Sequence, residues 1–303
     1  MIVLLEPPRP PGLPSGGFRY QARIVEALAP AARRVQVPPA ELHRCVRLLQ
    51  QGEPQATVLV DGWFADLTDA PLPDGVTALL HMVPARADWS TSPLPVIATG
   101  QPTADAVAVQ ARTVHVVRPG VDACFAAQPR RGEPSFAVVC AGTICAAKGQ
   151  RRLLAALRDL QAPWRLTFVG STDHDPDEVA ALRKQAASLP VTIHDAVTPE
   201  ALAALYAEHD VFATLSTSES YGMAAAEAAA AGLPLFGLET GELETFGDET
   251  RRTLLPVDAD DDVIRQRLAA LAADVPPRGA TDPAMRSWQD AAHELLAAIR
   301  ASD

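Results

Sequence analysis

Strand-length apolar runs alternate with helical segments along most of this 303-residue chain. After an initial strand at 2–5, the first part has expected strands at 34–37, 57–60, 77–82, 94–98 and 113–117, with helices at 18–29, 39–50 and 102–110. The pattern begins again with strands at 136–141, 164–170, 189–194, 211–215 and 233–238, and helices after residue 148, at 175–188 and at 199–208. Alternation of this kind predicts an α/β protein with parallel, doubly wound sheets.

Length and composition are those of a globular protein with two domains. A chain of 303 residues exceeds the size at which one core stops growing. No apolar run reaches the length of a membrane-spanning helix, and the N-terminal MIVLLEPPRPP, without a basic region, is expected to be a strand and not a signal peptide. The four cysteines form no CxxC pair. Reduced thiols in a cytoplasmic protein are therefore expected.

The net charge of −11 is unevenly placed. The chain up to Asp122 has a net charge of −1, and the remainder carries −10. This acidity argues against nucleic acid as the main partner. The first fifty residues instead contain more basic than acidic residues, and arginines at 33, 34, 44 and 47 are among them. A solvated basic face is the first interpretation of these arginines, and weak peripheral contact with a membrane surface is the second. Charge does not predict the oligomeric state.

The segment from Thr217 to Pro234 combines two carboxylates with a helix start. An apolar run at 210–216 precedes it, Ser220 is the expected N-cap, and the alanine-rich residues from Met223 form a helix that Gly232 and Pro234 end. Glu219 lies before the helix and Glu227 two turns into it. The free N–H groups of about residues 221 to 224 suit a phosphate. The segment therefore predicts a site for an anion and for hydroxyl groups, as in a nucleotide-diphosphate sugar.

The segment ESYGMAAAEAAAAGLP resembles the E-x7-E signature of retaining, GT4-type glycosyltransferases of glycosyltransferase group 1. The resemblance covers most of the chain and is strongest from 114 to 238. It implies the GT-B fold, two Rossmann-like domains facing a cleft. It also implies that Glu219 holds hydroxyls of the donor sugar and Glu227 those of the ribose. The donor-binding set further includes Ser220, Tyr221, Gly222 and Met223.

A lysine at a helix start supports the same resemblance. Lys148 precedes the helix after the strand at 136–141, where its charge opposes the helix dipole unless an anion lies there. No P-loop pattern surrounds it. In GT4 enzymes this lysine typically binds the donor diphosphate, and an arginine usually follows the first glycine of the loop. Here Gly142 is followed by Thr143, and Arg151 or Arg152 are alternative cations. The departure at Thr143 leaves the phosphate site with one expected cation fewer.

The N-terminal part has its own candidates. Gly16 and Gly17 follow a strand and precede a helix, an arrangement that allows a phosphate to approach backbone N–H groups. GT4 relatives often carry a similar GG-x-x-x-Y. His81 ends a strand, where the ligand crevice of an open α/β sheet lies, and the resemblance places it beside the donor sugar. Asp61 and Trp63 are weaker acceptor-side candidates.

Domain boundaries follow from the same patterns. The predicted domains are an acceptor-side domain at 1–122, a nucleotide-sugar domain at 123–282, and a final helix, apolar on one face, at 283–303 that crosses back to the first domain. A linker is expected at 126–135. Two acidic runs, at 173–175 and 258–262, look like metal ligands but precede helices, so N-capping explains them. No metal and no cofactor are predicted.

The predicted function is transfer of a sugar from a UDP or GDP sugar to an unidentified acceptor. His81, Lys148 and Glu219 are the expected catalytic residues, and the resemblance implies front-face attack with retention of the anomeric configuration. Three alternatives remain open: a sugar-nucleotide epimerase or phosphorylase, a nicotinamide-dependent dehydrogenase, and a catalytically weak or inactive nucleotide-sugar-binding protein. The missing GxGxxG argues against the dehydrogenase, and Thr143 is the best support for the inactive protein.

Overall fold

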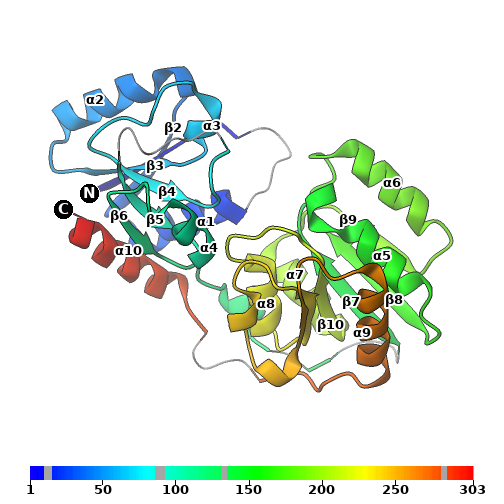
Figure 1. The fold of residues 1–303 in the computed structure, drawn as a ribbon. Helices are drawn as coiled ribbons and strands as arrows, with labels where there is room; N and C mark the ends of the chain where they lie inside the picture. Colours follow the sequence, from blue (N-terminus) through cyan, green and yellow to red (C-terminus); the bar gives the residue numbers. More distant parts are fainter. Residues whose placement is uncertain (10–15, 86–92, 128, 131–134, 281–284, 303) are drawn as a thin grey trace. The chain divides into compact units, whose positions relative to one another are not determined.

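The computed structural model describes residues 1–9, 16–85, 93–127, 129–130, 135–280 and 285–302 (Figure 1). The chain divides into two compact units. The described residues up to Gly120, together with those from Arg286 onward, form the first unit, and the described residues from Val121 to Met285 form the second. Parts of the expected linker at 126–135 and the expected start of the last helix at 283 lie outside the described residues.

The first unit is built on a six-stranded parallel sheet with the order β2-β1-β3-β4-β5-β6. Its strands are β1 (Ile2–Glu6), β2 (Ala32–Gln36), β3 (Thr57–Asp61), β4 (Thr77–Leu80), β5 (Pro95–Ala98) and β6 (Thr113–Val116). Its helices are α1 (Gly16–Leu28), α2 (Leu42–Gly52), α3 (Phe64–Leu67), α4 (Gln101–Val107) and the C-terminal α10 (Trp288–Ser302). Helix α10 packs against α1 (Figure 1).

The second unit repeats the architecture with the order β12-β11-β10-β7-β8-β9. Its strands are β7 (Phe136–Ala141), β8 (Trp164–Val169), β9 (Val191–His194), β10 (Val211–Thr214), β11 (Leu235–Leu238) and β12 (Arg252–Leu255), and its helices are α5 (Gln150–Arg158), α6 (Pro176–Ala186), α7 (Pro199–Glu208), α8 (Met223–Ala230) and α9 (Asp261–Ala273). Separate apolar clusters lie under α5, α6 and α9 and under α7 and α8. Helices therefore cover both faces of this sheet, as in a doubly wound fold.

Most of the expected elements are confirmed within one to three residues, and the doubly wound, GT-B-like fold class with them. The acidic runs act as predicted, since Asp175 and Asp260 cap α6 and α9 through backbone N–H groups of Glu178 and Val263. The edge strand β12 was not predicted, because its segment RTLL is short and only Leu255 in it is buried. The last helix begins at Trp288, later than expected.

Among the described residues, no helix is both long and apolar enough to cross a membrane. All four cysteines are free thiols.

Candidate functional site

Lys148 and Glu219 meet where the strand order of the second unit reverses. β7 is the first strand of this unit, and its neighbours are β8 on one side and β10 on the other. Lys148 follows β7 and Glu219 follows β10, both beyond the carboxyl ends of their strands. Loops that leave two adjacent strands in opposite directions open a crevice at this edge, and ligands bind there in doubly wound proteins.

Two glycines let the loops at this edge approach one another closely. Gly149 has a left-handed backbone (φ 67°), and a Cβ atom there would lie 2.4 Å from the carbonyl oxygen of Leu215 at the end of β10. At Gly170, after β8, a Cβ atom would lie 1.9 Å from the carbonyl oxygen of Gly142. Only glycine fits in these positions. The loops after β7, β8 and β10 therefore form one packed edge.

The side chains of Lys148 and Glu219 are in direct contact. Lys148 Nζ lies 2.5 Å from Glu219 Oε1, and the two side chains are 28% and 20% exposed. Cys140, on β7, is close enough to feel both charges, but burial raises the pKa of its thiol to about 12. Cys140 is therefore a protonated core residue and not a nucleophile, and the charged groups in contact here are the ammonium of Lys148 and the carboxylate of Glu219.

The start of helix α8 differs from the expected one. Ser220 is not the N-cap. The N-cap is Gly222, with φ 104°, and no side chain caps the helix. Glycine is favoured here because residues with a Cβ atom rarely adopt this φ. The neighbouring Tyr221 packs edge-on against Phe246, with ring centroids 5.0 Å apart. The first backbone N–H groups of α8 thus start from a glycine turn, without a serine hydroxyl competing for them.

The loop after β11 closes around the same turn. Glu242 N donates to the carbonyl oxygen of Tyr221 at 2.9 Å, and the hydroxyl of Thr240 donates to that of Ser216 at 3.2 Å. A Cβ atom at Gly241 would lie 2.6 Å from the Tyr221 carbonyl oxygen. Two other chain segments therefore hold the Glu219–Met223 turn, which itself follows β10: the loops after β7 and β11.

Glu227 lies on the buried face of α8. It is 2% exposed, whereas Glu219 keeps a fifth of its side chain in solvent. The two predicted hydroxyl-binding carboxylates thus differ in accessibility. The structure places Glu219 against Lys148 and leaves Glu227 in the interior of the unit, so a ribose-binding role for Glu227 stays a prediction.

Gln150 is a residue of this edge that sequence reasoning missed. Its side chain is 1% exposed, and Nε2 donates to the carbonyl oxygen of Thr143 at 2.9 Å. Gln150 therefore ties the Gly142–Thr143 loop to the start of α5. The signal was present in the sequence: Gln150 continues the apolar stripe of Leu153, Leu154 and Leu157. A polar residue in such a stripe needs a buried hydrogen-bond partner.

The first unit brings Gly17 and His81 together. An ideal Cβ atom at Gly17 would lie 2.7 Å from His81 Cδ2, so the imidazole packs directly on the glycine backbone at the start of α1. The ring of Tyr20 meets His81 edge-on, with centroids 5.3 Å apart, and its hydroxyl donates to the carbonyl oxygen of Val117 at 3.0 Å. Gly16 is the first residue of α1 and is exposed.

Gln21 and Asp61 complete this cluster. Gln21 Nε2 lies 2.5 Å from Asp61 Oδ2 and 3.0 Å from His81 Nε2, and Asp61 Oδ1 accepts from the backbone N–H of Trp63 at 2.9 Å. Burial lowers the pKa of His81, and the carboxylate of Asp61 opposes that shift. Gln21 was missed as well, although it occupies the buried stripe of α1 with Ile24 and Leu28.

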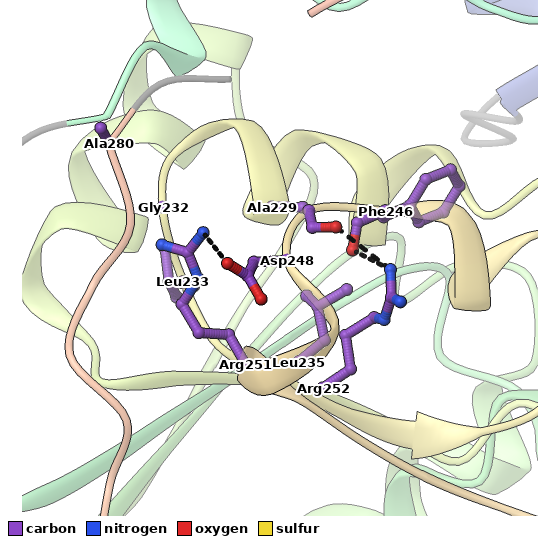
Figure 2. Close-up of a pocket in the computed structure, with 10 residues that line it drawn as sticks. Ala229, Gly232, Leu233, Leu235, Phe246, Asp248, Arg251, Arg252 and Ala280 are labelled. Carbon is purple, nitrogen blue, oxygen red and sulfur yellow. Dashed lines mark hydrogen bonds and ion pairs between the residues drawn. The ribbon is translucent and has the colours of Figure 1, made fainter. Parts of the chain in front are cut away.

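A separate cavity of about 350 Å³ lies at the opposite edge of the second sheet (Figure 2). It borders the amino ends of β11 and β12, where Leu235 pairs with Arg252. Its charged groups already have partners: Arg251 faces Asp248 at 3.8 Å, and Arg252 donates to the carbonyl oxygens of Phe246 and Gly247. None of the predicted site residues lines it, so it is not part of the candidate site.

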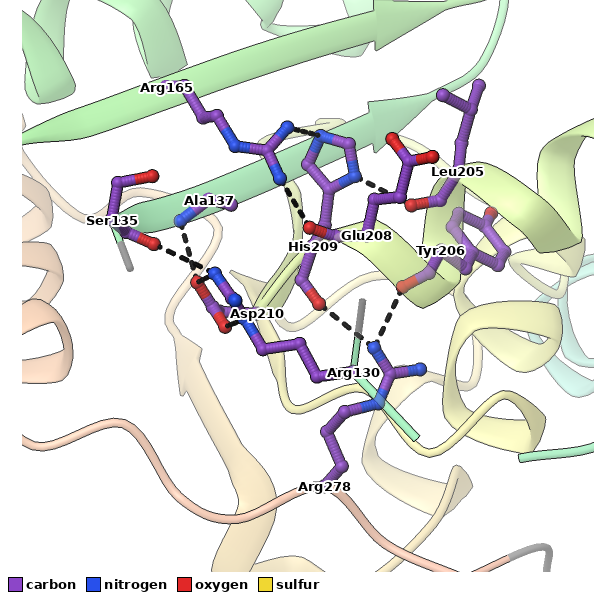
Figure 3. Close-up of polar contacts among 10 residues, drawn as sticks. All are labelled: Arg130, Ser135, Ala137, Arg165, Leu205, Tyr206, Glu208, His209, Asp210 and Arg278. Carbon is purple, nitrogen blue, oxygen red and sulfur yellow. Dashed lines mark hydrogen bonds and ion pairs between the residues drawn. The ribbon is translucent and has the colours of Figure 1, made fainter. Parts of the chain in front are cut away.

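The amino ends of β7, β8 and β10 carry a buried polar network (Figure 3). Asp210 pairs with Arg130 and accepts from the backbone N–H of Ala137 at 2.9 Å. Arg278 donates to the carbonyl oxygens of Tyr206 and His209 at 2.8 and 2.9 Å. These contacts join segments at 130, 210 and 278 of the second unit. The network is structural, because it lies away from the edge that carries Lys148 and Glu219.

Comparison with known proteins finds sequence relatives of the second unit. The family described as "Glycosyl transferases group 1" matches residues 135–274, a range that contains Lys148, Glu219 and Glu227. D-inositol 3-phosphate glycosyltransferase from Xylanimonas cellulosilytica is 34% identical over 151 residues, which are 44% of this chain and 36% of that protein. The chain thus matches little more than a third of that relative's length.

Solved structures give the fold of the whole chain. Sucrose-phosphate synthase from Thermosynechococcus elongatus has a TM-score of 0.77 at 16% identity, over 99% of this chain and 98% of that one. HepE from Anabaena, in complex with UDP and glucose, has a TM-score of 0.64 at 16% identity, over 100% and 95%. The resemblance inferred from the sequence is therefore confirmed: the chain has a GT-B-like fold, and its residues 135–274 match the family of glycosyl transferases group 1.

Proposed function

We propose that this protein is a glycosyltransferase that moves a sugar from a nucleotide-diphosphate sugar to an acceptor. The observation that carries the proposal is the contact of Lys148 with Glu219 at the edge where the strand order reverses, inside the segment that matches the family. A cation for phosphate and a carboxylate for hydroxyl groups are adjacent there. These are the two chemical functions that a sugar diphosphate requires.

The donor is proposed to be a UDP or GDP sugar. UDP is placed first in the tests because HepE, a protein with a similar fold, has a solved complex with UDP and glucose. The free cysteines agree with the cytoplasm as the compartment of the reaction.

In the proposed mechanism, the ammonium of Lys148 turns from Glu219 to the diphosphate of the donor. The phosphate charge replaces the carboxylate as its partner, and Glu219 becomes free to accept hydrogen bonds from sugar hydroxyls. The first N–H groups of α8 face the same loop edge and add partial positive charge. Charge that develops on the leaving diphosphate is then stabilised by groups already in place. His81 and the Gly16–Gly17 start of α1 would serve the sugar, as the family resemblance implies.

The acid–base chemistry follows from the family resemblance. Retention by front-face attack lets the departing phosphate take the proton of the acceptor. In this mechanism Glu219 binds hydroxyl groups and Cys140 stays protonated, so neither serves as the general base. Metal-independent transfer is proposed on the resemblance alone.

The test is a thermal-shift panel of UDP, GDP and ADP sugars with their free nucleotides. A ligand that binds the native state raises Tm by an amount set by its concentration and Kd. One nucleotide class should stabilise wild type and fail to stabilise Lys148→Ala. Lys184→Ala is the matched control, because Lys184 is exposed on α6. Absence of any shift with wild type would contradict the proposal.

Thr143 favours a second candidate, a protein that binds a nucleotide sugar without transferring it. Thr143 is half-buried at the loop edge where the family usually has an arginine. Isothermal titration with the stabilising donor, followed by assays for free sugar and for epimerised donor, separates the candidates. Binding without transfer or hydrolysis supports the binding protein, and an epimerised donor supports an epimerase.

A further inference from the structure

The buried contacts of His81 determine which of its two ring nitrogens carries the proton. A neutral imidazole has one donor nitrogen and one acceptor nitrogen, and the partners of the ring decide between them. In the first unit, the partner of His81 Nε2 is Gln21, whose own orientation is set by Asp61.

Asp61 fixes the amide of Gln21. A carboxylate only accepts hydrogen bonds, so the group of Gln21 that lies 2.5 Å from Asp61 Oδ2 must be the nitrogen and not the oxygen. Asp61 is 4% exposed and Gln21 is fully buried. With the amide reversed, two buried oxygens would face one another without a proton between them. That arrangement costs a buried unsatisfied group on each side.

Gln21 then fixes the ring of His81. The amide nitrogen has two hydrogens. One points to Asp61, and the other is the only hydrogen available for the 3.0 Å contact with His81 Nε2. His81 Nε2 must therefore accept, which leaves the proton on Nδ1. A protonated imidazolium would place two N–H donors against each other at this contact, so the contact favours the neutral ring. Burial favours the neutral ring as well, because it lowers the pKa of His81.

The packing around His81 keeps the ring in place. The Gly17 backbone covers the ring on the Cδ2 and Cγ side, and Tyr20 meets it edge-on. His81 nevertheless stays partly exposed, and Gln21 is the hydrogen-bond partner of the ring among the described residues. Nδ1 is therefore left with a proton and without a partner in the described part of the chain.

We propose that Gln21, oriented by Asp61, is a positioning residue that holds His81 in the Nδ1–H tautomer, so that His81 offers a ligand a hydrogen-bond donor and not a general base. Together with the proposed function, on which this last step rests, the partner would be an oxygen lone pair of the sugar nucleotide. The assignment of the tautomer itself rests only on Asp61, Gln21 and His81.

The first experiment is long-range ¹H–¹⁵N NMR on the full chain with ¹⁵N-labelled histidine, with His81→Asn to assign the signals. Wild type should show a pyridine-like Nε2 and a pyrrole-like Nδ1 for His81. A pyrrole-like Nε2, or a doubly protonated ring at neutral pH, would overturn the proposal. This measurement needs no donor and no activity. A failed tautomer assignment and a failed donor screen are therefore distinguishable results.

Two variants test the positioning role. Gln21→Glu replaces the donating nitrogen by an oxygen, so His81 should change to the Nε2–H form or to the imidazolium. Gln21→Met removes the amide, so both tautomers should appear. Gln51→Met, at an exposed position of α2, is the control that should keep the wild-type spectrum. An unchanged His81 spectrum in folded Gln21→Met would also overturn the proposal. If that variant does not fold, the wild-type spectrum still decides.

Discussion

Lys148 Nζ and Glu219 Oε1 lie 2.5 Å apart, although 71 residues separate them in the chain. The contact exists because β7 and β10 are neighbours in the sheet and both residues follow the carboxyl ends of these strands. The two charges neutralise each other at a site that is otherwise suited to an anion. A donor diphosphate would therefore compete with Glu219 for the same ammonium, and this competition leads to the first prediction.

Lys148→Ala and Glu219→Gln should affect different ligands. Lys148→Ala is expected to weaken the binding of both the free nucleoside diphosphate and the sugar nucleotide, because both ligands carry the phosphates. Glu219→Gln is expected to weaken binding of the sugar nucleotide at least tenfold, since charge-assisted hydrogen bonds are worth roughly 1.5–3 kcal/mol. Because it also removes the carboxylate that competes for Lys148, it should leave binding of the free nucleotide unchanged or make it tighter. Isothermal titration measures both Kd values. Glu208→Gln, an exposed substitution on α7, is the control.

Loss of binding in these variants will not reflect unfolding. The two side chains are partly exposed, and ion pairs of this kind contribute about 0–1 kcal/mol to stability. Both variants should therefore unfold, without ligand, within a few degrees of wild type. Equal weakening of the free nucleotide by both substitutions would contradict the division of roles between Lys148 and Glu219.

Gly149→Ala should destabilise the second unit by more than the strain of its backbone alone. Gly149 and Gly247 have nearly equal positive φ values, 67° and 64°. A Cβ atom at Gly149 would lie 2.4 Å from the Leu215 carbonyl oxygen, whereas one at Gly247 would have its nearest neighbour at 3.6 Å. Gly247→Ala therefore measures strain, about 1–2 kcal/mol. Gly149→Ala adds the clash, so it should lower the free energy of unfolding measured in urea clearly more than Gly247→Ala does. Equal costs would show that the loops separate without a penalty.

The sequence predicted the elements that repeat and missed the contacts that depend on register. Alternating strands and helices were enough for two parallel sheets, and the glycines and Lys148 marked the loops at their carboxyl edge. The contact between Lys148 and Glu219 could not be predicted, because it depends on β7 and β10 being adjacent in the strand order. Gln21 and Gln150 lie in buried helical stripes, and helical periodicity predicts the burial of a position but not the partner of a polar side chain there.

The prediction that Ser220 is the N-cap of α8 was wrong. A serine before an alanine helix is the preferred N-cap by local chemistry. In the structure, the cap position has a backbone φ of 104°, which residues with a Cβ atom rarely adopt, and Gly222 takes it. The backbone conformation of the turn thus overrode the capping preference of the Ser220 hydroxyl.

Gln150→Met should leave stability nearly unchanged and weaken donor binding. The substitution removes the hydrogen bond to the Thr143 carbonyl oxygen, which destabilises by about 1 kcal/mol. It also removes Gln150 Oε1, a buried oxygen without a hydrogen-bond partner among the described residues, which offsets that loss. The Gly142–Thr143 loop then loses its tie to α5. A Tm within a few degrees of wild type, with a several-fold higher Kd for the sugar nucleotide, is the expected pair of results.

Gln185→Met is the control for that experiment. Gln185 lies on α6, and its amide donates to the carbonyl oxygen of Arg151 on α5, so it also joins two segments by a side chain-to-backbone bond. Its hydrogen bonds go to Arg151 and not to the Gly142–Thr143 loop, and it is partly exposed. The affinity of Gln185→Met for the sugar nucleotide should equal that of wild type. A strongly destabilised Gln150→Met with unchanged affinity in its folded fraction would make Gln150 a core residue only.

His209 is a fully buried imidazole at the amino end of β10 (Figure 3). Nδ1 lies 2.6 Å from the Leu205 carbonyl oxygen, to which it donates, and Nε2 accepts from the Thr167 hydroxyl at 2.8 Å. Arg165 also faces Nε2, at 3.5 Å. Burial lowers the pKa of His209 to about 4. The bond to Leu205 and the Asp210 carboxylate oppose this shift, and Arg165 and Arg130 add to it.

The second unit should therefore lose stability as the pH falls from about 6.5 to about 4. The unfolded chain takes up a proton on His209 near pH 6.5 and the folded chain only near pH 4, so between these values the unfolded state binds more protons. The stabilisation is complete above pH 6.5, and about 3 kcal/mol of it is lost by pH 4. His209→Gln should flatten this part of the pH profile in urea unfolding, whereas His174→Gln, at an exposed position, should keep the wild-type slope. Carboxylates that titrate in the same range are common to all three proteins, so the difference between the profiles isolates His209. Parallel profiles for wild type and His209→Gln would mean that the buried imidazole is protonated in the folded protein, with Thr167 or a water molecule turned to accept from it.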